Sequence, residues 1–179
     1  ALQKVLHLGG KVLTVSDSSG YIYAPNGFDS EHLEFLMDLK NIRRGRVKEM
    51  ADQFKEVDFF SGKRPWGVKA DVALPCATQN ELSGEEAKIL VDNGIQCVAE
   101  GANMPCTPEA IEIFQAKGVL FSPGKASNAG GVATSGLEMS QNSLRYNWTR
   151  EEVDQKLREI MLNIHNSCIE HGKQKNGYV

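Results

Sequence analysis

Short apolar segments alternate with amphipathic helices along this sequence, and this alternation strongly limits how the chain can fold. Helices are predicted to begin after the capping residues Asp29, Ser83 and Thr107, because apolar side chains at helical spacing follow each of them. Strands are predicted at residues 11–16, 71–74, 96–99 and 119–121. Neighbouring parallel strands need a crossover, which such helices provide. We therefore predict an α/β fold with a doubly wound, mostly parallel sheet, followed by C-terminal helices.

The composition excludes several classes of protein. The chain of 179 residues has 20 Lys and Arg against 23 Asp and Glu, so its net charge of −3 gives no basic field for nucleic acid. No apolar run approaches the roughly 18 residues that a membrane span needs. The first residues also lack the pattern of a signal peptide. We expect a cytoplasmic protein with neither a nucleic-acid partner nor a membrane partner.

The cysteines and histidines follow no metal-binding spacing. Neither a CxxC pair nor an HExxH motif occurs, so no metal site is predicted. Cys97 falls in a predicted strand and Cys168 on the apolar stripe of the last predicted helix, and both positions are typical of buried, reduced thiols. Cys76, in a loop after a strand, is the one candidate nucleophile, although a structural thiol is the simpler interpretation.

Polar or glycine-rich segments follow every predicted strand, at residues 17–20, 75–80, 100–103 and 122–128. Ligands bind at the carboxyl ends of the strands in sheets of this kind, so these segments are candidate binding loops. Residues 125–131 are predicted as a loop that presents backbone N–H groups and a helix N-terminus to a carboxylate or amide ligand. A flexible glycine loop is the alternative. Ser135 lies within the helix that follows, where a serine usually bonds a backbone carbonyl.

Asp17 stands where an acidic residue commonly receives an adenine-ribose hydroxyl, although on its own a turn aspartate is the commoner explanation. Ser18 and Ser19 add hydroxyl donors beside it. Positive charge follows shortly after, at Lys40, Arg43, Arg44 and Arg46. Together these groups favour a 2′-phosphate, and so NADP over NAD. Cations that complement a helix C-terminus are the alternative for the basic residues alone.

The chain contains neither G-x-G-x-x-G nor a P-loop motif. A dinucleotide-binding domain begins with a strand and a glycine-rich turn, whereas this sequence begins in a predicted helix. We therefore expect a Rossmann-like domain whose first strand and turn lie upstream. The expected organisation is a partial dinucleotide-binding domain with a substrate-cleft loop over residues 1–147, and a helical segment over residues 148–179 that packs back on it.

Four motifs resemble the NADP-dependent hexameric glutamate dehydrogenases: SDSSG at 16–20, LPCATQNE at 74–81, AEGANMP at 99–105 and SPGKASNAGGVATSGLEMSQN at 122–142. The motifs are long, in order and correctly spaced over nearly the whole chain. The resemblance is to most of that family's C-terminal nucleotide-binding domain. It implies that the catalytic lysine and aspartate lie in an N-terminal domain outside this sequence. No residue here is therefore assigned an acid–base role, and we expect the segment alone to be inert.

The resemblance also implies binding roles by matching position. Asp17 and Ser18 would face the adenine ribose and its phosphate, and Lys40 and Arg46 would neutralise that phosphate. Six further residues would lie toward the nicotinamide and the substrate: Ala77 and Thr78 beside the nicotinamide, Asn103 at its ribose, Asn128 at both nicotinamide and substrate, and Ser135 at the substrate's side-chain carboxylate, beside Val132.

The activity implied by the resemblance is reductive amination of 2-oxoglutarate with ammonium and NADPH to give L-glutamate, and the reverse, in a homohexamer of the full-length chain. A related dehydrogenase for leucine, phenylalanine or valine is the nearest alternative. Ser135 favours the glutamate enzyme over it, because an acidic side chain needs a polar partner. A non-catalytic nucleotide-binding module and a thiol enzyme using Cys76 are two further hypotheses.

Overall fold

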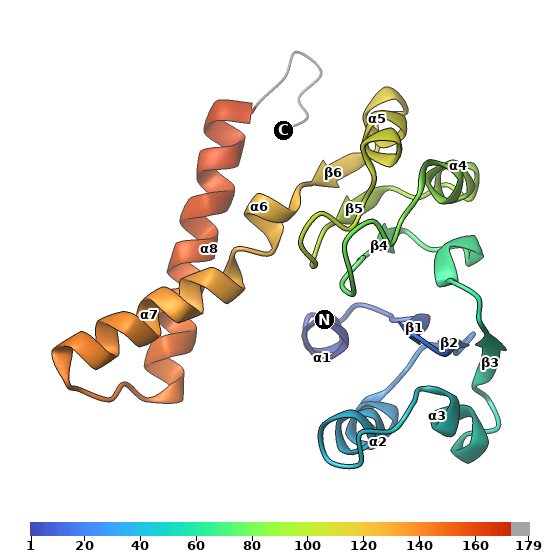
Figure 1. Cartoon of the computed structure of the whole chain (residues 1–179), viewed down its shortest axis with the longest axis horizontal. Coiled ribbons are helices and arrows are strands. Elements are labelled where there is room, and N and C mark those ends of the chain that lie inside the picture. The colour runs from blue at the N-terminus through green and yellow to red at the C-terminus, as the bar shows by residue number, and fades with distance from the viewer. Residues whose placement is uncertain (173–179) are drawn as a thin grey trace. The chain divides into compact units, whose positions relative to one another are not determined.

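The structure is a computed structural model that describes residues 1–172. The chain divides into two compact units (Figure 1). The first comprises residues 1–73 and 85–95, and the second comprises residues 74–84 and the chain from residue 96 onward.

The first unit contains an antiparallel sheet with the strand order β1 (Thr14–Asp17), β2 (Gly20–Tyr23), β3 (Asp58–Ser61). Its helices are α1 (Leu2–His7), α2 (Ser30–Asn41) and α3 (Lys48–Gln53), and α3 contacts both β2 and β3. The short elements η1 (Pro65–Gly67) and β4 (Val72–Ala73) follow, together with most of α4 (Gly84–Asp92). The core of the unit is apolar and consists of Ile22, Ala24, Phe28, Leu36, Leu39, Val47, Met50 and Val57.

Helix α2 begins where the sequence predicts. The Asp29 side chain accepts a hydrogen bond from the backbone N–H of His32 at 3.0 Å, and the His32 ring in turn accepts one from the Asp29 backbone N–H. Such a cap contributes about 1 kcal/mol to a helix. Leu36 and Leu39, three residues apart on one face, are buried in the core, so capping and amphipathic spacing together specify this helix.

The interpretation of residues 17–20 as a loop after a parallel strand is wrong. Asp17 pairs with Gly20 across a tight hairpin, and Gly20 is the first residue of β2. Both β2 and β3 were missed, because their four-residue lengths and flanking turn residues hide them from periodicity. Ile22 of β2 is fully buried, so packing against the unit's own helices holds this antiparallel ribbon in place.

The second unit contains a βαβ unit of the predicted kind. Strands β5 (Cys97–Ala99) and β6 (Leu120–Ser122) pair in parallel, and α5 (Pro108–Ala116) connects them. The predicted cap of α5 is confirmed, because the Thr107 hydroxyl accepts from the Ala110 N–H at 3.4 Å and proline occupies the first helical turn. Phe114 of α5 is fully buried, which anchors the helix in this unit.

Three further helices follow: α6 (Gly124–Ser127), α7 (Gly130–Leu144) and α8 (Arg150–Gly172). The last two lie side by side in Figure 1 and contact each other. The prediction of a loop over residues 125–128 is wrong, since Gly124–Ser127 forms the turn of helix α6. A capping box opens α8, where the Thr149 hydroxyl accepts from the Glu152 N–H and the Glu152 carboxylate accepts from the Thr149 N–H.

The four cysteines are free thiols. Cys97 and Cys168 are only half-buried, contrary to the prediction, whereas Cys106 is buried, because tertiary packing closes over the loop that follows β5. Over residues 1–172, no helix is both long and apolar enough to cross a membrane. The same residues contain no group of three or more His, Cys, Asp and Glu side chains placed to hold a metal ion.

Candidate functional site

Asp17, at the end of β1, is surrounded by hydrogen-bond donors of its own unit. One carboxylate oxygen accepts from the Ser19 N–H at 2.9 Å and from the Ser19 hydroxyl at 2.6 Å. The other accepts from Lys40 Nζ at 2.9 Å and from the Val47 N–H at 3.0 Å. A carboxylate has about four acceptor positions, so these contacts fill them. Asp17 therefore acts as a turn aspartate, which was one of the two explanations that the sequence allowed. It also anchors Lys40.

Two opposing effects act on the Asp17 carboxyl group. Its burial raises the pKa, but the hydrogen bonds from Ser19, Val47 and Lys40 outweigh burial and hold the pKa well below the ordinary value of 3.8. The ionised form is thus stabilised by folding. Its contribution to stability is complete above about pH 4 and is lost as the pH falls through the lowered folded-state pKa.

Replacing Asp17 with asparagine is expected to lower the free energy of unfolding at pH 7 by about 2 kcal/mol, because the new amide group faces the Lys40 and Val47 donors. The deficit relative to the wild type should shrink as the pH falls below about 4. Urea denaturation of the full-length protein between pH 7 and pH 3 measures it. Asp52→Asn, at an exposed aspartate of α3, is the control. A deficit that stays constant over this range would contradict the role of the charge.

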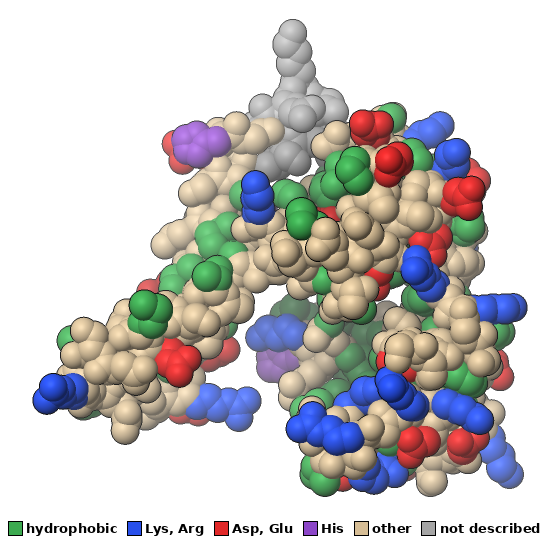
Figure 2. All heavy atoms as spheres, in the orientation of Figure 1, with side chains coloured by type: hydrophobic (Ala, Val, Ile, Leu, Met, Phe, Trp, Pro, Cys, Tyr) green, Lys and Arg blue, Asp and Glu red, His purple; other side chains and the backbone are tan. Residues whose placement is uncertain are grey.

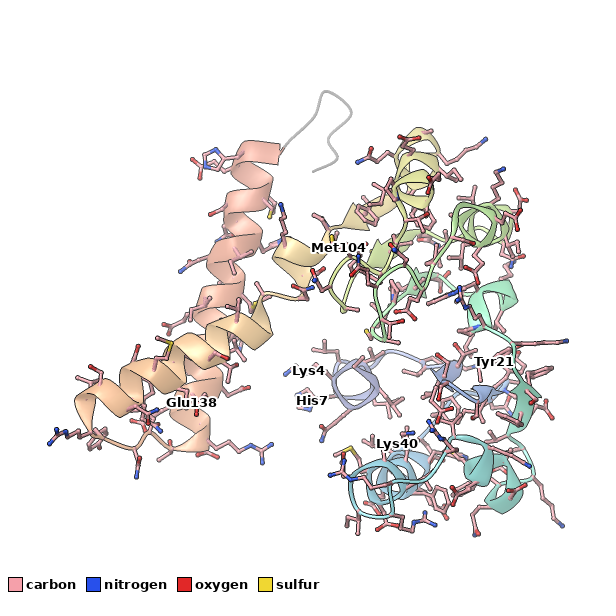
Figure 3. All side chains as sticks on the ribbon, viewed as in Figure 1. Lys4, His7, Tyr21, Lys40, Met104 and Glu138 are labelled. Atoms are coloured by element: carbon pink, nitrogen blue, oxygen red, sulfur yellow. The ribbon has the colours of Figure 1, made fainter. Side chains whose placement is uncertain are left out.

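Lys40 and Arg46 both reach the turn between β1 and β2. Lys40 Nζ also donates to the Gly45 carbonyl at 3.0 Å, which leaves one of its three protons. Arg46 NH1 donates to the Ser18 hydroxyl oxygen at 2.7 Å, so the Ser18 proton and most of the guanidinium protons remain for a ligand. We call Ser18, Lys40 and Arg46 the donor cluster. Figure 3 shows Lys40 on α2, and Figure 2 shows Lys and Arg side chains gathered over α2 and the chain after it.

The rest of the basic stretch does not join the donor cluster. Arg43, which follows α2, pairs with Asp38 at 2.7 Å, and its guanidinium group lies 4.7 Å from the centre of the Phe35 ring, so both contacts hold it against α2. Arg44 is exposed and adopts a left-handed backbone conformation, with a φ of 58°. Lys40 stands in the last turn of α2, where it also complements the helix dipole.

In the second unit, the loops after residue 74 and after β5 are joined by backbone hydrogen bonds. The N–H groups of Gly101 and Ala102 both donate to the Pro75 carbonyl, at 2.9 and 3.1 Å. The Asn80 N–H donates to the Met104 carbonyl at 3.0 Å. These bonds bring the loop that contains Ala77 and Thr78 against the loop that contains Asn103. Two of the predicted binding loops at strand ends therefore meet, as expected for this fold.

Asn128 connects the chain after β6 to the loop that follows β5. Its side-chain Nδ2 donates to the Ala102 carbonyl at 2.7 Å. Helix α7 begins two residues later and contains Val132, which is 74% exposed, and Ser135, which is also exposed. The Ser135 hydroxyl donates to the Gly131 carbonyl at 3.4 Å, as expected of a serine inside a helix, and keeps its acceptor positions.

Cys76 does not have the surroundings of a catalytic thiol. Its sulfur lies so close to Gly101 that a side-chain carbon on the glycine would collide with it. Cys76 is an exposed residue, but partial desolvation of its sulfur raises the pKa of the thiol and so lowers its thiolate fraction. This environment favours the structural interpretation over a thiol enzyme.

Glu100, which follows β5 directly, is a site residue that was not predicted from the sequence. Its carboxylate is buried and accepts hydrogen bonds from two backbone N–H groups, those of Cys106 and Gly124. A sequence signal was present, namely an acidic residue at a strand end within AEGANMP. It could not reveal a partner 24 residues away, because that contact exists only in the folded chain.

The βαβ unit, with polar loops joined at its strand ends, belongs to the Rossmann-like α/β class. The model of the glutamate/leucine/phenylalanine/valine dehydrogenase family matches residues 1–179, and the chain belongs to this family. It is 60% identical over 172 residues to an NADP-specific glutamate dehydrogenase of Haemophilus influenzae, covering 96% of this chain and 38% of the relative. It is 52% identical over 179 residues to an NAD-specific glutamate dehydrogenase of Bacteroides fragilis, covering all of this chain and 40% of the relative.

The solved structure of Plasmodium falciparum glutamate dehydrogenase confirms the predicted fold class. It matches with a TM-score of 0.91 and 54% identity over 94% of this chain and 36% of that chain. The chain thus spans about 40% of the length of the curated relatives it matches. Relatives of similar sequence identity are named as NADP-specific or as NAD-specific, so the evidence that bears on the cofactor is the donor cluster of this chain.

Proposed function

We propose that this chain is the NADP-binding part of a glutamate dehydrogenase, which reductively aminates 2-oxoglutarate with ammonium and NADPH to L-glutamate and catalyses the reverse reaction. The donor cluster is the observation that supports NADP as the cofactor. Ser18, Lys40 and Arg46 together offer a hydroxyl, an ammonium and a guanidinium group at one turn. Family membership and the glutamate dehydrogenases among the relatives support the reaction.

The donor cluster fits the 2′-phosphate that distinguishes NADP from NAD. Arg46 supplies a planar set of donors that suits phosphate oxygens, and Lys40 supplies a compact positive charge. Asp17 offsets part of this charge through its ion pair with Lys40 at 2.9 Å, whereas Arg46 donates to the neutral Ser18 hydroxyl and keeps its charge for the phosphate. Contact between Asp17 and the adenine ribose stays a prediction, and it would have to compete with the hydrogen bonds that Asp17 already accepts.

The nicotinamide end is proposed for the second unit. Ala77, Thr78 and Asn103 would line it on the joined loops, and Asn128 would hold the carboxamide and border the substrate. NADPH, when bound, supplies the hydride that reduces the imine of 2-oxoglutarate. The loops of this chain would orient the cofactor and exclude water from the cleft.

Substrate recognition is proposed for α7. The Ser135 hydroxyl would turn its proton from the Gly131 carbonyl, one helical turn back, to donate to the distal carboxylate of the substrate, and Val132 would pack beside it. The catalytic lysine and aspartate are proposed for an N-terminal domain of the full-length protein. We likewise propose a homohexamer in the cytoplasm, with residues 1–147 as the nucleotide-binding part and a helical segment over residues 148–179, of which residues 173–179 lie outside the described part of the chain, packing back on it.

Ser135→Ala is expected to raise the KM for 2-oxoglutarate about 10- to 100-fold in the full-length protein, since the substrate carboxylate would lose a hydrogen bond to a charged group. The control is Ser140→Ala on the same helix, where the Ser140 hydroxyl donates to the Gly136 carbonyl at 2.9 Å. Steady-state rates of NADPH oxidation with 2-oxoglutarate and ammonium measure both variants.

Three other results would argue against this assignment. Equal KM values for the two variants would remove Ser135 from the substrate site. Faster turnover of the keto acids of leucine, phenylalanine or valine would place the protein elsewhere in its family. Binding of NADPH without turnover of any keto acid would support a nucleotide-binding module instead.

A further inference from the structure

Glu100 is a buried acidic residue to which neither the sequence motifs nor the proposed reaction assigns a role. It follows the last residue of β5, and only 4% of its surface is exposed. One carboxylate oxygen accepts from the Cys106 N–H at 3.2 Å, and the other accepts from the Gly124 N–H at 2.7 Å. Burial of a carboxyl group is costly unless it is hydrogen-bonded, so these two bonds account for its place in the fold.

The two N–H groups come from segments that are far apart in the sequence. Cys106 directly follows the loop of residues 101–105, so the first bond ties the far end of that loop to Glu100, which precedes it. Gly124 is the first residue of α6, where a helix leaves N–H groups without partners in its own backbone. One side chain thus joins the loop of Asn103 to the helix that leads to Asn128.

Further bonds tighten the same junction. The Ser127 hydroxyl donates to the Glu100 carbonyl at 2.6 Å, and the Asn128 amide donates to the Ala102 carbonyl. A side-chain carbon at Gly124 would lie 2.9 Å from the Asn128 Nδ2 and 3.3 Å from the Glu100 carboxylate. Glu100 and Asn128 thus leave no room for a side-chain carbon between them.

We propose that Glu100 is a positioning residue, which holds the Asn103 loop and Asn128 in the arrangement that orients the nicotinamide ring for hydride transfer. This inference rests on the proposed function. The carboxylate acts through two backbone N–H groups, the Cys106 thiol and the residues that these contacts place.

Glu100→Gln in the full-length protein tests the inference, because glutamine keeps the shape but replaces one acceptor oxygen with a donor NH₂ that faces a backbone N–H. We expect the Kd for NADPH to rise about 10-fold, as for the loss of one hydrogen bond to a charged acceptor. We expect kcat to fall about 10- to 100-fold, as for small misplacement of a reacting group. The Kd for 2′,5′-ADP, which lacks the nicotinamide half, should stay within about twofold, because the donor cluster belongs to the first unit and Glu100 to the second.

Two further variants make the outcome decisive. Glu112→Gln changes an exposed glutamate of α5 in the same way and should match the wild type. Gly124→Ala keeps the Glu100 carboxylate but places a methyl group against the Asn128 amide. It should therefore also raise the Kd for NADPH and leave the Kd for 2′,5′-ADP nearly unchanged.

Wild-type protein that fails to bind NADPH would overturn the proposed function. If the wild type binds NADPH, two results for Glu100→Gln overturn the inference alone. One is a Kd and a kcat equal to those of Glu112→Gln. The other is equal weakening of NADPH and 2′,5′-ADP, which would indicate general loss of structure.

Discussion

Replacing Lys40 and Arg46 together with glutamine is expected to weaken NADPH binding about 100-fold or more, while the affinity for NADH changes less than about threefold. The reason is that NADPH differs from NADH by the 2′-phosphate, and each of these cations would contribute a charge-assisted hydrogen bond to it. Fluorescence titration of the full-length protein with each nucleotide measures the two Kd values. Since the phosphate contacts are electrostatic, the wild-type preference for NADPH should also diminish as salt is added.

A matched control separates the loss of specific donors from the loss of net charge. Lys48→Gln combined with Lys55→Gln removes two positive charges at exposed positions of the same unit. This double variant should change the NADPH affinity less than about threefold, because exposed charges farther from the phosphate are screened. Equal losses for NADPH and NADH in the Lys40 and Arg46 variant would refute the 2′-phosphate role.

Gly20→Ala is expected to destabilise the first unit by about 3 kcal/mol or more and to weaken NADPH binding with it. Gly20 has a φ of 143°, which L side chains rarely adopt, and a carbon added there would collide with the Phe60 carbonyl oxygen of β3. The hairpin from β1 to β2 would have to open, and this hairpin presents Asp17 and Ser18. Urea denaturation of the full-length protein, followed by circular dichroism, measures the loss.

Gly62→Ala separates backbone strain from the steric collision at Gly20. Gly62 also has a positive φ, of 65°, but no atom lies within 4 Å of the position that a side-chain carbon would occupy. Its replacement should therefore cost only the strain of the left-handed conformation, about 1 kcal/mol. Similar losses for the two variants would show that close approach to Phe60 does not matter.

Local signals predicted helices α2 and α5 and the βαβ unit. Asp29 and Thr107 cap these helices as expected, because a cap is made by residues three apart or fewer and needs no distant partner. Strands β2 and β3 escaped prediction, since a four-residue strand is stabilised by its neighbours across the sheet rather than by its own pattern. Helix α6 escaped for a similar reason: its glycine and serine residues are typical of loops, and Glu100 binds its first N–H.

Some features of the candidate site could likewise be predicted from local sequence, and others could not. Ser18, Lys40 and Arg46 could be proposed from chemistry and order along the chain, because a phosphate needs hydroxyl and cationic donors near a strand end. Order along the chain could not show that Lys40 is held by Asp17 while Arg43 turns to Asp38. Those choices depend on distances between side chains of different elements.

The motifs and capping residues were sufficient to identify the α/β class, the family and the groups that a nucleotide would need, since each is expressed by residues close together in the chain. Tertiary structure alone decided that Asp17 is enclosed by four donors and that Glu100 binds the N–H group of Gly124, 24 residues further along the chain. The physical reason is that a buried charge is tolerated only where the fold brings donors to it, and which donors arrive is settled by packing.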